Sequence, residues 1–178
     1  MRRLNTYVKL GTPFAALLLF SSLSCIKCKA QDSIAINFTI SFSENTTLTT
    51  TQRQELTTKV ESIIARTNSS GGNDSPFVIV PTLTVTGEQT TESGIVTVTL
   101  VEGELQLIVK NKHDGTIYNE LTTTLQATRR QNDTTDGATL LIRAVNTRDS
   151  RFVRFIRTTK KRIAERYADS AIELPQTQ

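Results

Sequence analysis

The sequence contains few of the side chains that support catalytic, metal and redox chemistry. Among its 178 residues there are no Trp, one His, one Met and two Cys. It also contains no Gly-rich phosphate loop, no Gly-x-Ser-x-Gly elbow and no His-Glu-x-x-His motif. A metal site needs three or four convergent ligands, so the single histidine, His113, is interpreted as a turn residue beside Asp114. We therefore expect no catalytic residue, no metal site and no cofactor.

Long hydrophobic runs are equally scarce. The one unbroken run of this kind, FAALLLF at residues 14–20, has seven apolar residues, whereas a membrane-spanning helix needs roughly 20. The run follows three basic residues: Arg2, Arg3 and Lys9. This layout is typical of a secretory signal peptide. We expect residues 1–30 to act as one, and we expect no transmembrane span after processing.

Both cysteines fall in this leader, and they allow different ways of processing it. Cleavage after Ala30 would use Cys28 and Ala30 as the small residues at the minus-three and minus-one positions. Alternatively, a lipoprotein peptidase cuts before Cys25, which then carries the lipid. A lipobox normally has Leu three positions before the cysteine, and here that position is Ser22. A retained leader is the third alternative. Under the first route the mature chain contains no sulfur, which excludes a disulfide or a thiolate site.

Removal of the leader also changes the charge. The leader carries five of the 21 Lys and Arg residues and none of the 17 Asp and Glu residues, so the formal net charge falls from +4 to −1. The sequence pI of 9.3 would otherwise indicate a polyanionic partner. Aromatic stacking platforms and groove-reading motifs are absent as well. We therefore expect no nucleic-acid partner.

The rest of the chain has the length of one ordinary domain. We expect a single domain over residues 31–172 and a frayed tail over residues 173–178, which includes Pro175. Aromatic residues make up only 6% of the chain, whereas Thr, Val and Ile are common. These β-branched residues favour a sheet wherever apolar and polar positions alternate.

The first predicted elements are a strand and a helix. Residues 34–42 alternate apolar and polar side chains, which predicts a half-buried strand. The sequence Thr51-Gln52-Arg53-Gln54 fits a capping box and predicts the start of a helix. Four apolar residues follow at helical spacing: Leu56, Val60, Ile63 and Ile64. They predict an amphipathic helix that ends before a loop at residues 68–76.

Three further strands follow the loop. Residues 77–87 predict a strand, in which Pro81 indicates a bulge or an edge position. The alternation over residues 95–109 changes parity across Gly103, which predicts a β-bulge there. A turn at residues 113–115 then leads into a return strand.

Two helices complete the pattern. Apolar spacing predicts a short helix over residues 138–145, and Asp149 or Ser150 can cap a longer one after it. The order is strand, helix, strand, strand, strand, helix, helix. It predicts an α+β fold, with an antiparallel-dominated sheet of about four strands and helices packed on one face. A parallel pair between the first two strands fits the helical crossover between them.

This order resembles the α/β domain shared by the curli-secretion lipoprotein family, the TolB amino-terminal domain and the lipoprotein activators of penicillin-binding proteins. The resemblance rests on the strand Phe77-Val78-Ile79-Val80, the long strand over residues 105–111, the turn Asp114-Gly115 and the return strand over residues 116–126. It covers nearly the whole chain after the leader. The chain departs from the group because Cys25 is poorly placed for lipidation, and no binding residues transfer one by one. The resemblance implies an envelope-assembly or regulatory module that acts by protein contact.

The last predicted helix carries a dense series of cations. Eight occur over nineteen residues: Arg148, Arg151, Arg154, Arg157, Lys160, Lys161, Arg162 and Arg166. A spacing of three drifts slowly around a helix, so we expect a broad band that faces solvent. The band is either a solvated face that keeps the helix soluble, or a patch for an acidic protein, an anionic headgroup or a glycan. In the second case, the candidate partner-binding residues are Arg151, Arg154, Arg157 and Lys161.

Together these observations predict an exported, non-catalytic accessory protein of the cell envelope. We expect it in the periplasm, at the outer membrane or secreted, and we expect it to bind envelope proteins that the sequence does not identify. One alternative is a surface glycan-binding or adhesin module, which would place aromatic residues on an exposed strand face. Another is a small carboxylate-dependent hydrolase, with acids such as Glu102 and Glu104 in a deep cleft.

Overall fold

The computed structural model describes residues 36–67, 75–93 and 96–172. The chain divides into two units, Met1–Ser33 and Ile34–Gln178, and the described residues belong to the second. The predicted leader (residues 1–30), Cys25 and the predicted tail (residues 173–178) therefore lie outside the described residues. The elements are β1 (Thr39–Ile40), α1 (Thr50–Ala65), β2 (Phe77–Ser93), β3 (Val96–Asn111), β4 (Ile117–Arg130), α2 (Gly137–Ala144) and α3 (Ser150–Ile172).

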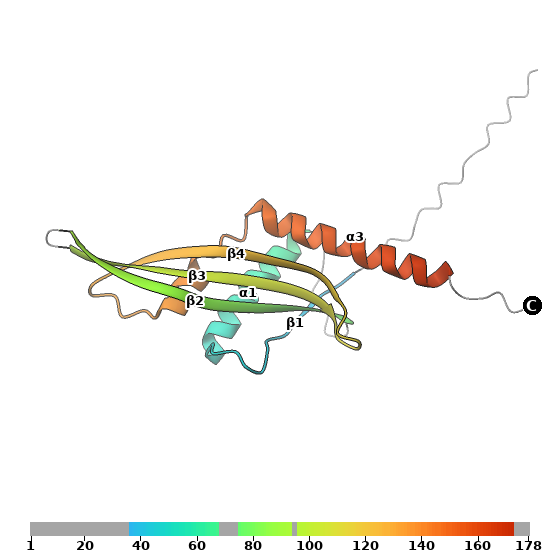
Figure 1. Cartoon of the computed structure of the whole chain (residues 1–178), viewed down its shortest axis with the longest axis horizontal. Coiled ribbons are helices and arrows are strands. Elements are labelled where there is room, and N and C mark those ends of the chain that lie inside the picture. The colour runs from blue at the N-terminus through green and yellow to red at the C-terminus, as the bar shows by residue number, and fades with distance from the viewer. Residues whose placement is uncertain (1–35, 68–74, 94–95, 173–178) are drawn as a thin grey trace, which may run out of the picture. The chain divides into compact units, whose positions relative to one another are not determined.

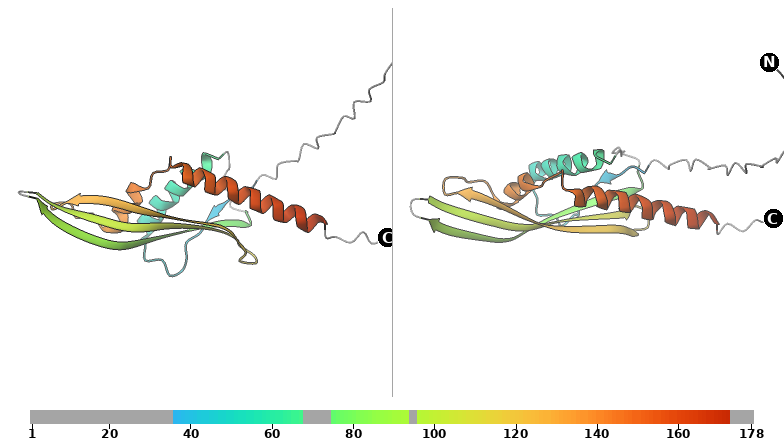
Figure 2. Two further views of the ribbon diagram at one scale, coloured as in Figure 1. Left: turned by 45° about the horizontal axis from the view of Figure 1, so that its top comes forward. Right: turned by 90° about the horizontal axis from the view of Figure 1, so that it is seen from above.

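The strands form one sheet in the order β1-β2-β3-β4. β1 pairs with β2 in parallel, and the other two pairs are antiparallel. The helices lie on one side of the sheet, with α3 running beside β4 (Figure 1, Figure 2). The predicted α+β class, element order and sheet type are confirmed. We call the side that α1, α2 and α3 pack against the helix face, and the other side the open face.

The core fills the space between the helix face and the helices. From β3 it includes alternate residues, Val101, Leu105, Leu107 and Val109, which are all completely buried. The helices contribute their apolar stripes, among them Leu56, Ile63, Leu141, Ile142, Phe152 and Ile156. Each such side chain stabilises the fold by about 1.5–3 kcal/mol relative to an exposed one. The predicted apolar positions of α1 and α2 therefore face the core, as do Phe152 and Ile156 of α3.

The first strand is much shorter than predicted. Ile36 and Phe38 are buried as the alternation indicated, but only Thr39 and Ile40 form the ladder of β1. Ser41 N–H makes a last bond to the carbonyl of Ile79 (3.1 Å), after which the chain turns away from the sheet. The pattern over residues 34–42 thus reports burial correctly and strand length wrongly, because alternation indicates which side chains are buried but not how far the backbone pairs with a neighbouring strand.

The capping box of α1 lies two residues before the predicted one. The N-cap is Thr49, whose hydroxyl accepts the N–H of Gln52 (3.3 Å), while Gln52 Oε1 accepts the N–H of Thr49 (2.8 Å). The prediction at Thr51 and Gln54 is therefore wrong. Gln52 Nε2 also donates to Asp136 Oδ1 (2.8 Å) and to Thr139 Oγ1 (3.2 Å), at the start of α2. These long-range bonds favour Gln52 over Gln54 as the capping residue.

The predicted β-bulge exists, but on the neighbouring strand. The irregularity lies in β2 between Val85 and Gly87, opposite Gly103 and Glu102 of β3. β3 itself pairs with β4 without interruption at these two residues. The change of parity in the sequence has another cause: Leu105 and its odd-numbered neighbours face the helices, whereas Leu100 faces the open side, where it is half-buried.

The other predictions for the strands hold, except that β2 continues six residues beyond the predicted end at residue 87. Pro81 lies beyond the last residue of β2 that pairs with β1, so it occupies an edge position where its missing N–H costs no ladder bond to β1. The turn between β3 and β4 contains Gly115 with a φ of 70°, a conformation that favours glycine. Asp114 Oδ1 accepts the N–H of Thr116 (2.8 Å) and closes this turn.

The last two helices begin at aspartates. Asp136 is the N-cap of α2 and accepts the N–H of Thr139 (3.0 Å). Asp149 accepts the N–H of Arg151 (2.8 Å) in the first turn of α3, which agrees with one of the two predicted caps. In α3, helical spacing predicts one buried stripe, made up of Phe152, Phe155, Ile156, Ile163 and Tyr167. Tyr167 departs from this prediction, since it is 43% exposed and packs edge-on against Phe77 (6.0 Å between ring centroids).

Candidate functional site

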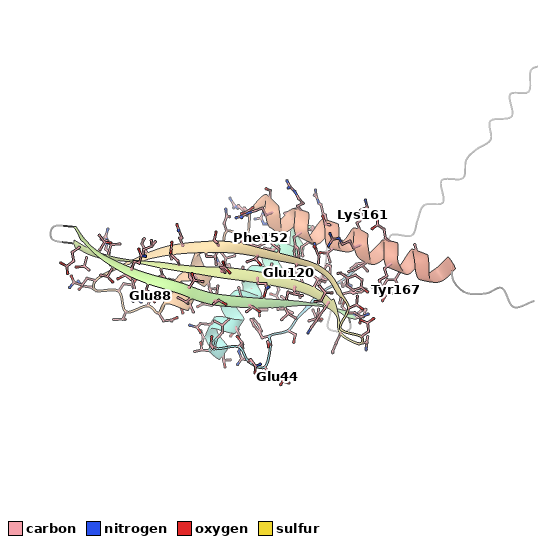
Figure 3. The ribbon with its side chains drawn as sticks, viewed as in Figure 1. Glu44, Glu88, Glu120, Phe152, Lys161 and Tyr167 are labelled. Carbon is pink, nitrogen blue, oxygen red and sulfur yellow. The ribbon has the colours of Figure 1, made fainter. Side chains whose placement is uncertain are left out.

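The predicted partner-binding residues lie on the side of α3 that faces away from the core. Arg151, Arg154, Arg157 and Lys161 are all exposed. An α-helix turns by roughly 100° per residue, so Arg154, Arg157 and Lys161 share one side of α3, with Arg151 at its margin. Figure 3 shows Lys161 on this outward side. We call Arg154, Arg157 and Lys161 the outer face of α3.

The four predicted residues differ in their partners. Arg151 forms an ion pair with Asp149 (2.7 Å), which raises the pKa of the guanidinium and lowers that of the carboxyl. Lys161 lies 3.6 Å from Glu165, one turn later. Arg154 and Arg157 make no side-chain hydrogen bond or ion pair with a described residue. Within the described part of the chain, two guanidinium groups of the predicted site therefore have no anionic partner.

Other cations of the predicted band turn toward the protein. Arg162 Nη1 donates to the carbonyl of Tyr118 (3.0 Å) and to Asn119 Oδ1 (2.8 Å). Lys160 reaches the carbonyl of Thr67 (3.5 Å), and burial lowers its pKa. Arg166 lies over the ring of Tyr118 at 6.0 Å. Arg162 and Arg166 stay exposed as predicted, although they also contact β4, whereas Lys160 is half-buried because the drift of the three-residue spacing carries it away from the outer side of α3.

Two polar residues that sequence reasoning did not single out attach α3 to the sheet. Asn119 of β4 donates through Nδ2 to the carbonyl of Phe155 (3.3 Å) and to Thr159 Oγ1 (3.1 Å). Thr159 is completely buried and itself donates to the carbonyl of Phe155 (2.8 Å). Polar side chains at core-facing positions of β4 and α3 are the signal that could have found them. Together with Arg162, they fix how far α3 rotates and hence which cations point outward.

A second surface feature is a groove of about 640 Å³ on the open face. Segment 39–43 forms one wall, and Val78, Val80, Ile108 and Lys110 lie on the open face by the register of β2 and β3. Lys112 of the turn also lines the groove, and its lining residues include no Asp or Glu. The groove therefore combines apolar and cationic side chains.

The candidate catalytic residues do not converge in a described groove. Glu102 accepts a bond from Gln126 Nε2 (2.7 Å) on the open face, and Glu104 is exposed on the same face. A groove of about 560 Å³ between α1 and α2 is lined by one acid, Glu55. His113 is exposed in the turn. The hydrolase alternative thus has no paired carboxylates in either groove.

The remaining features concern ligands and membranes. Among residues 36–67, 75–93 and 96–172, no group of three or more His, Cys, Asp or Glu side chains is placed to hold a metal ion. None of the described helices is long and apolar enough to cross a membrane. The strand residues on the described open face include no aromatic side chain, so the feature expected of a glycan-binding module is not found there.

No protein-family model matches the chain, and no curated protein matches it. Its fold is partly similar to a minor lipoprotein from Acinetobacter baumannii, at 12% identity and a TM-score of 0.40, over 77% of this chain and 92% of that one. A predicted lipoprotein from Caulobacter crescentus matches at 10% identity and a TM-score of 0.38, over 79% of this chain and 93% of that one. A predicted homologue of a neuraminyllactose-binding haemagglutinin from Helicobacter pylori matches at 10% identity and a TM-score of 0.36, over 78% of this chain and 91% of that one. Similarities of this size assign neither a family nor a function to the chain, and the resemblance to the curli-secretion group stays a prediction.

Proposed function

We propose that this chain is an exported cell-envelope protein that works without catalysis, by binding an acidic protein through the outer face of α3. Export is supported by the leader pattern of residues 1–30, in which basic residues precede a short apolar run. Binding is supported by one observation, namely that Arg154 and Arg157 are exposed and have no anionic partner among the described residues.

Repulsion within the outer face favours a binding role over simple solvation. Arg154 and Arg157 are three residues apart, and Lys161 follows Arg157 by four. Like charges at these spacings destabilise a helix by about 0.2–0.5 kcal/mol per pair. Of these three cations, only Lys161 has an acid close by, Glu165. Carboxylates of a partner would relieve the repulsion and accept paired N–H bonds from the guanidinium groups.

The test is capture of partners from detergent-solubilised envelope extracts of the source cells. The bait is the tagged full chain, compared with the double variant Arg154→Glu/Arg157→Glu. We expect the variant to lose the captured protein, because the change replaces two cations by two anions at the centre of the contact. The partner is then purified, and its affinity for both forms is measured to show that the contact is direct.

The matched control is Arg130→Glu/Arg143→Glu, which makes the same change of charge at two exposed positions outside α3. This control should retain the partner. Equal capture by the wild type and the α3 variant would exclude the outer face as the binding surface. Mass spectrometry of the N-terminus of the protein made in its own cells tests export separately, since we expect a chain that begins at Gln31 and the lipoprotein route predicts an acylated Cys25.

A further inference from the structure

The open face carries an apolar and cationic area at the end where β3 turns into β4. Val80 and Ile108 are opposite each other, and Lys110 is opposite Ile117, so these four side chains share the open face. Lys112 follows in the turn. We call Val80, Ile108, Lys110, Lys112 and Ile117 the hairpin patch. It adjoins the 640 Å³ groove, which four of its five members line.

Ile117 is the most exposed large apolar residue of this patch. It is 59% exposed, whereas Val80 and Ile108 are half-buried. The middle of the same face is polar instead: it carries Thr82, Thr84, Glu104, Gln106, Thr122 and Thr124. Exposed apolar side chains rimmed by polar residues mark interaction surfaces more often than scattered single ones do.

The charge of the patch is positive. Among the described residues, no group forms a hydrogen bond or an ion pair with the side-chain ammonium group of Lys110 or Lys112. The two nearest carboxylates along the strands, Asp114 and Glu120, keep their negative charge while they accept the N–H of Thr116 (2.8 Å) and Gln106 Nε2 (2.6 Å), and among the described residues neither forms an ion pair with Lys110 or Lys112. The lysines are therefore available to an external anion.

The N-terminal segment joins the domain beside this patch. The carbonyl of Asn37 accepts the hydroxyl of Ser75, just before β2, and Thr39 Oγ1 donates to the carbonyl of Phe77 (3.2 Å). Thr39 also lines the groove. A leader or lipid that held the preceding 35 residues at a membrane would therefore attach to the domain next to the hairpin patch.

We propose that the hairpin patch docks on the surface of an anionic phospholipid bilayer. This inference rests on the proposed location of the chain in the cell envelope. Ile117 enters the boundary between headgroups and acyl chains, while Lys110 and Lys112 extend along the apolar surface and place their ammonium groups among the phosphates. Short-range attraction of this kind requires anionic lipid and weakens with added salt.

The absence of Trp from the chain permits a direct test. Ile117→Trp puts a single indole in the patch of the full chain, which is then mixed with vesicles of brominated phosphatidylcholine, with or without phosphatidylglycerol. We expect bromine to quench the indole strongly only when phosphatidylglycerol is present. Adding Lys110→Gln or Lys112→Gln should lower the ratio of docked to undocked protein by about fivefold for each lysine.

The matched control is Val85→Trp. Val85 is 41% exposed and lies on the helix face of the same sheet, so an indole there reports lipid contact made outside the hairpin patch. The proposal would be overturned by equal quenching at the two positions. It would also be overturned if quenching of Ile117→Trp did not depend on phosphatidylglycerol or on either lysine. So would a concentration-dependent blue shift of Ile117→Trp without vesicles, which would make the patch an interface between two copies of the chain. These results do not involve Arg154 or Arg157, so they are independent of partner capture by α3.

Discussion

Thr123 and Thr159 are both buried, but their hydroxyl groups differ in hydrogen bonding. Thr123 lies on the helix face of β4 opposite Leu105 and is 4% exposed. Its hydroxyl has no hydrogen-bond partner among the described residues. Thr159, on α3, is also buried, but its hydroxyl bonds to Asn119 and to the carbonyl of Phe155. A buried hydroxyl without a partner has lost its bonds to water and destabilises the fold.

We predict that Thr123→Val raises the free energy of unfolding by about 1 kcal/mol, because valine keeps the shape of the side chain and removes the unpaired hydroxyl. The control is Thr159→Val, which breaks two hydrogen bonds and should lower the free energy of unfolding by about 1 kcal/mol. Urea denaturation of both variants measures these changes. A loss of stability in Thr123→Val would show that its hydroxyl has a partner.

Among the elements, α2 packs closely against β3 at Gly103, which has no side chain. A Cβ atom at this position would collide with Leu141 Cδ1 of α2 and would lie 2.5 Å from the carbonyl oxygen of Thr84 in β2. The bulge in β2 lies opposite the same residue. Glycine is therefore required here by the space between the sheet and α2, and not by its own backbone angles.

We predict that Gly103→Ala lowers the free energy of unfolding by about 1–3 kcal/mol, since α2 or the bulge must shift to admit the methyl group. Gly87→Ala is the matched control, because an added Cβ there meets nothing within 4 Å. Thermal unfolding followed by circular dichroism compares the two variants. A Gly103→Ala protein as stable as the Gly87→Ala protein would contradict the packing argument.

The elements also show where prediction from sequence succeeded and where it failed. The stripe from Leu56 to Ile64 predicted a buried helix face correctly, because helical periodicity is a local property. The capping register failed because Thr49 and Thr51 are both followed three residues later by glutamine, and only Gln52 also reaches Asp136. The bulge was assigned to Gly103 because Leu100, an apolar residue on the open face, changes the parity of the apolar pattern of β3 without an extra residue in that strand.

On the scale of the whole molecule, four aspartates link stability to pH. Hydrogen bonds from Thr116, Thr135 and Arg151 lower the pKa of Asp114, Asp133 and Asp149, respectively. For Asp136, burial raises the pKa, but bonds from the side chain and N–H of Thr139 outweigh it and the net shift is downward. Each carboxylate thus binds its proton less readily in the folded chain than in the unfolded chain.

The sign of the pH dependence follows from these shifts. A lowered pKa stabilises the folded state above the unfolded value, near 3.8 for aspartate, and this contribution is lost as the pH falls through the folded value. We predict that the free energy of unfolding decreases below about pH 4. The variant Asp136→Asn/Asp149→Asn keeps both helix caps. Its free energy of unfolding should decrease less steeply as the pH falls. Denaturant unfolding at a series of pH values measures both slopes, and identical slopes would contradict the assignment.

The two proposed surfaces belong to different sides of the sheet. The outer face belongs to α3, which lies on the helix side of the sheet (Figure 2), and the hairpin patch lies on the open face. Contact with a bilayer through one surface thus leaves the cations Arg154 and Arg157 accessible to a protein. The variants at Ile117 and at Arg154 separate the two contacts experimentally.

The sequence by itself determined the order of the elements, the α+β class, the turn before Ile117 and the buried stripes of α1 and α2, because these follow from local periodicity and turn chemistry. The tertiary structure alone decided which cations of α3 remain unpaired, since Asn119 and Arg162 set its rotation through bonds to residues about forty positions away. Likewise, strand register placed Lys110 beside Ile117. Register and helix rotation depend on contacts between distant segments, which no short stretch of sequence contains.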